Sequence, residues 1–102
     1  MKPEQFIREY GVEMAREVVA NQPVMNSASY NPSTNRYSAT VNTGKSVYVG
    51  RLKSTIEALD LIEFCGGIDI ARELEPDLVG DNFQDIQDAI AIHESIYGGA
   101  HE

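Results

Sequence analysis

The spacing of apolar residues changes period twice along this chain of 102 residues, and that change limits the fold more than any other feature. Apolar residues recur at helical spacing up to about Ala20, alternate with polar residues from Tyr37 to Val49, and return to helical spacing from Leu52. We therefore predict a single α+β domain, in which a small antiparallel β-meander with a hairpin packs against four to five short helices. The expected segments are residues 1–22 (helical), 24–50 (β-meander), 52–97 (helical and strongly acidic) and 98–102 (a flexible tail).

Glycine and proline set the expected helix limits. The predicted helices run from Pro3 to Tyr10, from Val12 to Ala20, from Leu52 to the Gly66-Gly67 pair, from Ile68 to a stop before Pro76, and from a cap at Asp81 or Asn82 to Gly98-Gly99. Their buried sides should include Phe6 and Ile7, then Leu52, Ile56, Leu59 and Ile62, and finally Phe83, Ile86, Ile90, His93 and Tyr97.

The middle of the chain carries the strand pattern. Strands are expected at 37–41 and 47–49, joined by a tight turn at 42–45 with the hairpin centred on Thr43-Gly44. A second turn at 31–35 makes Val24 to Tyr30 a weaker third strand.

Charge is sorted along the chain. Residues 1–56 contain seven of the eight Lys and Arg with four acidic residues, a net of +3, whereas residues 57–102 contain twelve acidic residues and only Arg72, a net of −11. Such an asymmetry indicates which partners the chain can associate with; it does not indicate a catalytic reaction. The overall charge of −8 disfavours direct nucleic-acid binding, although a small basic face could form from Arg36, Lys45, Arg51 and Lys53.

No residue pattern predicts catalysis or a cofactor. Cys65 is the only cysteine, so no internal disulfide is expected, and it is interpreted as a small buried apolar residue. His93 is interpreted as a partly buried histidine rather than a metal ligand, and His101 lies in the expected tail. We predict a non-enzymatic protein without cofactor or metal; in a minor alternative, Asp85, Asp88 and His93 would form a carboxylate–histidine site for catalysis or ligand binding.

Residues 39–46 fit a relaxed phosphate-binding loop, with Ala39 in place of the first glycine. Such a loop needs a helix directly after it, whereas Val47 to Val49 is expected to be a strand. The hairpin turn accounts for Gly44 and Lys45, so nucleotide binding is not predicted.

The candidate partner-binding residues are acidic. They form two expected helical stripes: Glu57, Asp60 and Glu63 in one, and Asp81, Asp85 and Asp88 in the other. A solvated face is the default interpretation, and an acidic docking surface for a basic partner is the functional one. If the carboxylate spacing followed that of a phosphate backbone, the surface would mimic nucleic acid.

An internal echo links the two halves. Gly11 to Val18 recurs 56 residues later as Gly67 to Leu74, with four of eight positions identical. The favoured interpretation is one helix–glycine–helix corner used twice, with Ala15 and Ala71 packing closely; duplicated docking sites or half-domains are the alternative.

Three segments together resemble a known group of proteins. They are 1–11 with Ala15 to Val19, the join Val47-Tyr48-Val49-Gly50-Arg51-Leu52-Lys53, and Leu61 to Ile68 with its Gly66-Gly67 corner. They are similar to small uncharacterised accessory proteins of lambda-like phages and prophages of enteric bacteria. The resemblance implies no catalytic residues; it implies a protein that acts by contact with another protein inside a bacterium.

The expected function is therefore binding of a host or phage protein through the acidic C-terminal helices. A nucleic-acid-mimicking inhibitor of a host or defence protein is the alternative. A cytoplasmic location is expected, because no apolar run approaches the ~20 residues of a membrane helix and Met1 to Gln5 lacks the start of a secretory signal. The oligomeric state stays open, a homodimer included.

Overall fold

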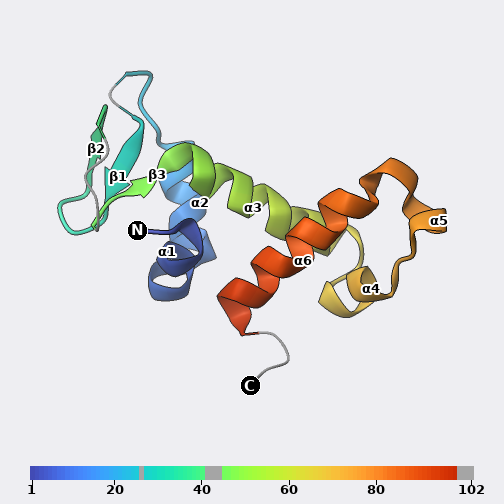
Figure 1. The fold of residues 1–102 in the computed structure, drawn as a ribbon. Coiled ribbons are helices and arrows are strands. Elements are labelled where there is room, and N and C mark those ends of the chain that lie inside the picture. The colour runs from blue at the N-terminus through green and yellow to red at the C-terminus, as the bar shows by residue number, and fades with distance from the viewer. Residues whose placement is uncertain (26, 41–44, 99–102) are drawn as a thin grey trace. The chain divides into compact units, whose positions relative to one another are not determined.

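The computed structural model describes residues 1–25, 27–40 and 45–98 of the chain. Their contacts separate into two compact units, a first unit of Met1–Ile56 and a second unit of Glu57–Glu102. The boundary between Ile56 and Glu57 is also the point at which the sequence changes from a net charge of +3 to −11. The predicted α+β class is confirmed, since helices precede and follow a small three-stranded antiparallel sheet in the chain (Figure 1).

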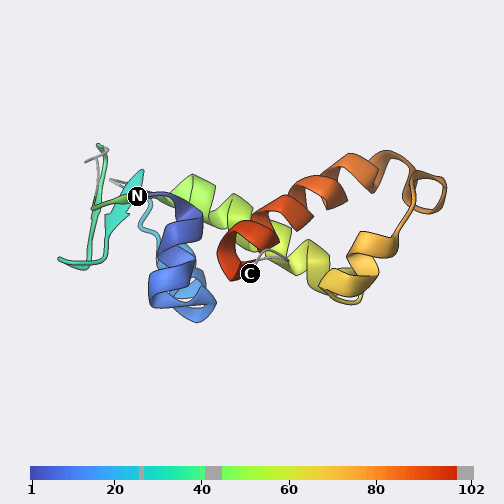
Figure 2. The same ribbon diagram turned by 60° about the horizontal axis from the view of Figure 1, so that its bottom comes forward.

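Two short helices open the first unit, with the predicted limits. These are α1 (Pro3–Tyr10) and α2 (Val12–Ala20). Pro3 occupies the first turn of α1, where a missing N–H costs nothing, and Gly11 separates the helices with φ 93°. The two helices contact each other and lie side by side in both views (Figure 1 and Figure 2). Phe6 and Ile7 of α1 are buried, as predicted.

The sheet of the first unit has three very short strands, β1 (Ser29–Asn31), β2 (Arg36–Ser38) and β3 (Val47–Tyr48). β1 is the central strand and pairs antiparallel with both others. Tyr30 is opposite Tyr37 on one side and Val47 on the other, so these three side chains share one face of the sheet. Rings of Tyr30 and Phe6 meet edge to face at 6.3 Å between centroids, which identifies this as the face that packs on the helices.

The strand pairing differs from the one predicted. β2 and β3 each pair with β1, and the weakest predicted strand is therefore the centre of the sheet. The predicted turn at 31–35 is the one that joins a described hairpin: Asn35 N donates to the Asn31 carbonyl at 2.8 Å, and Asn35 adopts φ 58°. The other predicted turn, centred on Thr43-Gly44, lies outside the described residues.

All three strands are shorter than predicted. β1 covers only Ser29–Asn31, where a strand from Val24 to Tyr30 was expected, and the other two end early for local reasons. β2 ends at Ser38, because the Ser38 hydroxyl accepts a hydrogen bond from Thr40 N at 3.2 Å and so bends the chain out of the ladder. β3 ends at Tyr48, because Val49 already begins helix α3 rather than ending a strand.

The described part of the second unit consists of helices joined by short turns and contains no strand. Its elements are the end of α3 (Val49–Phe64), then α4 (Ile68–Glu73), α5 (Pro76–Val79), the 3₁₀ turn η1 (Gly80–Asn82) and α6 (Phe83–Tyr97). α4 stops before Pro76 as predicted, and α5 and η1 are additional. Asn82 precedes α6, but its side chain makes no capping hydrogen bond.

An aliphatic cluster forms the core of the second unit. Its buried members are Ile62, Ala71, Ile86, Ala89 and Ile90. Cys65 packs against this cluster and is half-buried rather than buried. Tyr97 is mostly exposed and Ile96 is buried instead, so the predicted inner side of α6 is wrong at its last turn. The predicted tail beyond Gly98, with His101, lies outside the described residues.

Gly11 and Gly67 form the same backbone corner. Their conformations are φ 93°, ψ 156° and φ 112°, ψ 171°, and each begins a helix whose fourth following residue, Ala15 or Ala71, is fully buried. The sequence echo therefore marks one corner used once in each unit. The units share nothing else of their architecture, because the first contains the sheet and the described second unit is helical.

Candidate functional site

The six acidic residues predicted to bind a partner all lie in the second unit and are all exposed. Glu57, Asp60 and Glu63 are on the exposed side of α3, and Asp85 and Asp88 are on that of α6. Asp81 lies in η1, before α6 begins, so the second stripe is not carried by one continuous helix as predicted. Asp88 accepts a hydrogen bond from Gln84 Nε2 at 2.9 Å.

Arg72, the only base of the second unit, is bound within that unit. Its guanidinium donates to Glu94 Oε2 at 2.9 Å and is 3.8 Å from Asp69 Oδ1. The positive charge of this unit is thus held against α4 and the last turns of α6. It does not neutralise the carboxylates at Asp81 and Asp85.

His93 is half-buried and stacks at a tilt on Tyr97, with 4.8 Å between ring centroids. Burial lowers the pKa of His93, the positive charge of Arg72 lowers it further, and Glu94 opposes both. Asp85 and Asp88, which the alternative site would combine with His93, are on the exposed part of α6. In the described part of the chain, no group of three or more His, Cys, Asp or Glu side chains is placed to hold a metal ion.

The four basic residues predicted as a possible basic face are exposed but do not lie on one element. Arg36 is on β2, Lys45 precedes β3, and Arg51 and Lys53 are on α3. The Arg51 guanidinium lies over the Tyr48 ring, 5.4 Å from its centroid. The segment that resembles a phosphate-binding loop is only partly described, since 41–44 fall outside the described residues. Strand residues Val47 and Tyr48 still separate it from α3.

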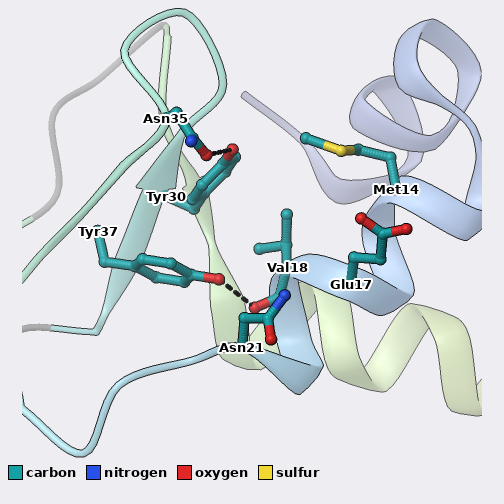
Figure 3. Close-up of a pocket in the computed structure, with 7 residues that line it drawn as sticks. All are labelled: Met14, Glu17, Val18, Asn21, Tyr30, Asn35 and Tyr37. Carbon is teal, nitrogen blue, oxygen red and sulfur yellow. Dashed lines mark hydrogen bonds between the residues drawn. The ribbon is translucent and has the colours of Figure 1, made fainter.

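A cleft in the first unit was not predicted. We call it the tyrosine cleft; it has a volume of about 280 Å³ and is lined by Met14, Glu17, Val18 and Asn21 of α2 and its end, and by Tyr30, Asn35 and Tyr37 of the β1–β2 hairpin. Figure 3 shows the α2 side chains on one side and the three hairpin side chains on the other. The cleft is therefore formed entirely where α2 faces the hairpin.

Two tyrosine hydroxyls fix the walls of this cleft. Tyr37 Oη donates to the Val18 carbonyl at 2.5 Å, and Tyr30 Oη donates to Asn35 Oδ1 at 2.5 Å (Figure 3). The rings of Tyr30 and Tyr37 are 5.0 Å apart, as cross-strand partners should be. The Tyr37 hydrogen bond joins β2 to α2, so the contact that packs the sheet on the helix also fixes the spacing between the two walls of the cleft.

The charge in the tyrosine cleft comes from one side chain. Burial raises the pKa of Tyr30 and of Tyr37, so both hydroxyls are neutral at physiological pH. Glu17 supplies a carboxylate at the exposed rim, and within the described part of the chain no Lys or Arg pairs with it. The cleft thus combines aromatic and aliphatic walls with one negative charge.

A second hollow in the first unit, of about 400 Å³, is lined by Lys2, Pro3, Glu4, Arg51, Ser54 and Thr55. The hydroxyls of Ser54 and Thr55 donate to carbonyls of their own helix, at Gly50 and Arg51. Glu4 offsets one of the two cationic side chains, Lys2 and Arg51, so this hollow keeps a single net positive charge.

Sequence reasoning missed the tyrosine cleft because its residues come from two separate segments, 14–21 and 30–37. The available signal was the pair Tyr30 and Tyr37, which flank the predicted turn at 31–35 and so must face each other in a hairpin. Their distance from Glu17 depends on the packing of the sheet on α2, which no local pattern encodes.

Comparison with protein-family models, curated proteins and solved structures finds no match for this chain. None of the helices in the described ranges combines the length and the apolar character that crossing a bilayer requires.

Proposed function

We propose that the chain is an accessory protein of a phage or prophage that binds a host or phage protein through the acidic surface of its second unit. The observation that carries the proposal is the coincidence of the charge boundary with the unit boundary at Ile56 and Glu57. A unit that collects twelve acidic residues and one base has a surface potential of one sign, and such a surface accelerates encounter with a basic partner and disfavours acidic ones.

The partner-binding residues are the predicted six, Glu57, Asp60, Glu63, Asp81, Asp85 and Asp88. Their exposure supports the proposal, and so does the retention of Arg72 within its own unit by Glu94. A nucleic-acid-binding protein of the host is the kind of partner whose basic surface would suit this set. In that case the chain would compete with the nucleic acid by occupying the same surface.

A second mode of contact has its own support. Phe64 and Leu78 of the second unit are 88% and 74% exposed, and exposed large apolar side chains are typical anchors of protein interfaces. In this mode the contact is mainly apolar, and the negative charge maintains solubility.

The experiment that separates the two modes is a pull-down from bacterial lysate at 0.1 M and 1 M salt, with mass spectrometry of the retained proteins. Charge-led binding weakens steeply, because the screening length falls from about 10 Å to about 3 Å over this range. A triple variant, Asp81→Lys, Asp85→Lys and Asp88→Lys, should lose the same partner.

The matched control is Glu4→Lys, Glu9→Lys and Glu13→Lys, which makes the same change in net charge in the first unit and should retain the partner. Retention of the partner by both triple variants and at both salt concentrations would contradict acidic docking. Loss of the partner with Phe64→Ser and Leu78→Ser would then assign the contact to the apolar side chains.

A further inference from the structure

We infer that the tyrosine cleft binds an organic cation, an alkylguanidinium or alkylammonium group with an aliphatic stem. This site is in the first unit, separate from the acidic set of the second, and does not depend on it. Its volume of about 280 Å³ suits a side chain or a small amine, not a nucleotide or a large cofactor.

The walls of the cleft fit the stem. Met14 of α2 and Tyr37 of the hairpin are half-buried and present the accessible aliphatic and ring surface, whereas Val18 and Tyr30 line the cleft as almost fully buried side chains (Figure 3). The unbranched thioether of Met14 adapts to ligands of different shape. Tyrosine faces attract cations through the ring quadrupole, and a planar guanidinium also stacks on them. An aliphatic chain ending in a cation therefore matches both kinds of wall.

The polar atoms of the cleft select a donor-rich head group. Both tyrosine protons are already donated, to the Val18 carbonyl and to Asn35 Oδ1, so each hydroxyl oxygen can offer a ligand only its acceptor lone pair. Glu17 adds two carboxylate oxygens that also only accept, and no cation in the described part of the chain occupies them. An anion would be repelled by the charge of Glu17, and a neutral donor would gain a hydrogen bond to it but not the attraction between opposite charges.

The position of Glu17 favours exchange rather than tight capture. Its side chain is exposed, so its attraction for the ligand is screened by salt and adds only a modest part of the affinity. Two sources could supply such a cation, an Arg or Lys side chain of a protein or a free amine of the cell. The chemistry of the cleft is the same for both.

The test is a titration of the full-length ¹⁵N-labelled protein, followed by amide chemical shifts, with three probes. Agmatine represents a free cation, N-acetyl-arginine amide represents a side chain, and N-acetyl-citrulline amide is the neutral isostere of the second probe. Agmatine or the arginine probe should shift Glu17, Asn21, Asn35 and Tyr37 saturably below about 20 mM, the weak end for fragments of this size. The citrulline probe should bind at least about fivefold more weakly than the arginine probe. Because agmatine carries two positive charges and the arginine probe one, a free amine is identified as the source only if agmatine also binds more tightly at 0.5 M salt, where general attraction to the acidic chain is screened.

Glu17→Gln should weaken binding of the cationic probes about fivefold, the upper end for a solvent-exposed ion pair, and Glu17→Asp should restore part of it. Glu13→Gln, on the same helix but outside the cleft, is the matched control and should leave binding unchanged. The spectrum of each variant shows directly whether it is folded. Equal binding of arginine and citrulline probes, equal binding by Glu17→Gln, or no saturable shift in the cleft would each overturn the inference.

Discussion

The two units of the chain use the same helix–glycine–helix corner but stabilise it by different means. In the first unit, Ala15 is fully buried, and the sheet is joined to the helices by the Tyr37–Val18 hydrogen bond and by the contact between the Phe6 and Tyr30 rings. In the second, Ala71 packs into an aliphatic cluster of isoleucine and alanine side chains. The comparison teaches that the corner sets only a local change of direction. The surrounding residues differ: the first unit has the tyrosine cleft, and the second has exposed acidic side chains.

The largest expected effect tests whether the two cores are separate. Tyr30→Ala removes a side chain that is 2% exposed at the centre of the sheet, and should cost about 3–5 kcal/mol of unfolding free energy in the first unit. Ile86→Ala should cost about 2–5 kcal/mol in the second. Urea unfolding followed by amide signals of Ile7 and Ile90 would report each unit. Equal loss at both probes for both variants would show one cooperative core and break the comparison.

The second-largest expected effect is the loss of stability when the glycine of either helix–glycine–helix corner is replaced. Gly11→Ala and Gly67→Ala should each destabilise by about 1–3 kcal/mol, because φ near +100° with extended ψ is accessible only to glycine. An added Cβ meets no atom within 4 Å at either position, so the cost measures backbone strain alone. Gly50→Ala in α3 is the control without strain, and should stabilise by about 0.4–1 kcal/mol. A neutral result at Gly67 with a loss at Gly11 would show that the two corners are not equivalent.

A smaller effect concerns the hydroxyl bonds that distinguish the first unit. Tyr37→Phe keeps the ring and removes the donor to the Val18 carbonyl, at a cost of about 0.5–1.5 kcal/mol. The thermal unfolding midpoint should fall accordingly. Tyr48→Phe is the comparison, because the exposed Tyr48 contributes a cation–π contact with Arg51 through its ring, and its midpoint should hardly change.

The smallest effect concerns pH in the second unit. Since the pKa of His93 is lower in the folded state than its ordinary value near 6.5, the unfolded chain takes up this proton first as pH falls. His93 therefore contributes stability above about pH 6.5 that is lost as pH decreases through its folded pKa. Arg72→Gln should raise the pKa of His93 in an NMR titration and cost under ~1 kcal/mol, less at high salt. An unchanged or lower His93 pKa would contradict the role given to Arg72.

Local signals predicted the limits of the elements well where a residue acts directly on the backbone, as proline and glycine do. Pro3, Gly11 and Gly67 gave the limits of α1, α2 and α4, and the alternation of Val47 with Tyr48 gave a buried and an exposed side chain in β3. The four-residue α5 was missed because one turn of helix shows no period, although Pro76 at its first position is a typical start.

Neither the strand order nor the tyrosine cleft could be predicted from the sequence, because both depend on contacts between residues far apart in the chain. β1 is central because its neighbours pair with it across separations of up to 19 residues, and Ser29–Asn31 itself carries only one apolar side chain. The alternation of apolar and polar residues predicted that the strand starting at Tyr37 continues to residue 41. It ends at Ser38, because the Ser38 hydroxyl accepts a hydrogen bond from Thr40 N. The helical period correctly predicted that the six acidic residues are exposed. Asp81, however, lies in the 3₁₀ turn η1 rather than in α6.

The negative charge of the second unit also affects self-association, because the side chains of Phe64 and Leu78 are exposed. At neutral pH, repulsion between copies opposes contact between these apolar side chains. As the pH approaches the isoelectric point near 4.6, the carboxylates take up protons and that repulsion weakens, while the apolar area stays the same. Acidification should therefore favour self-association through Phe64 and Leu78.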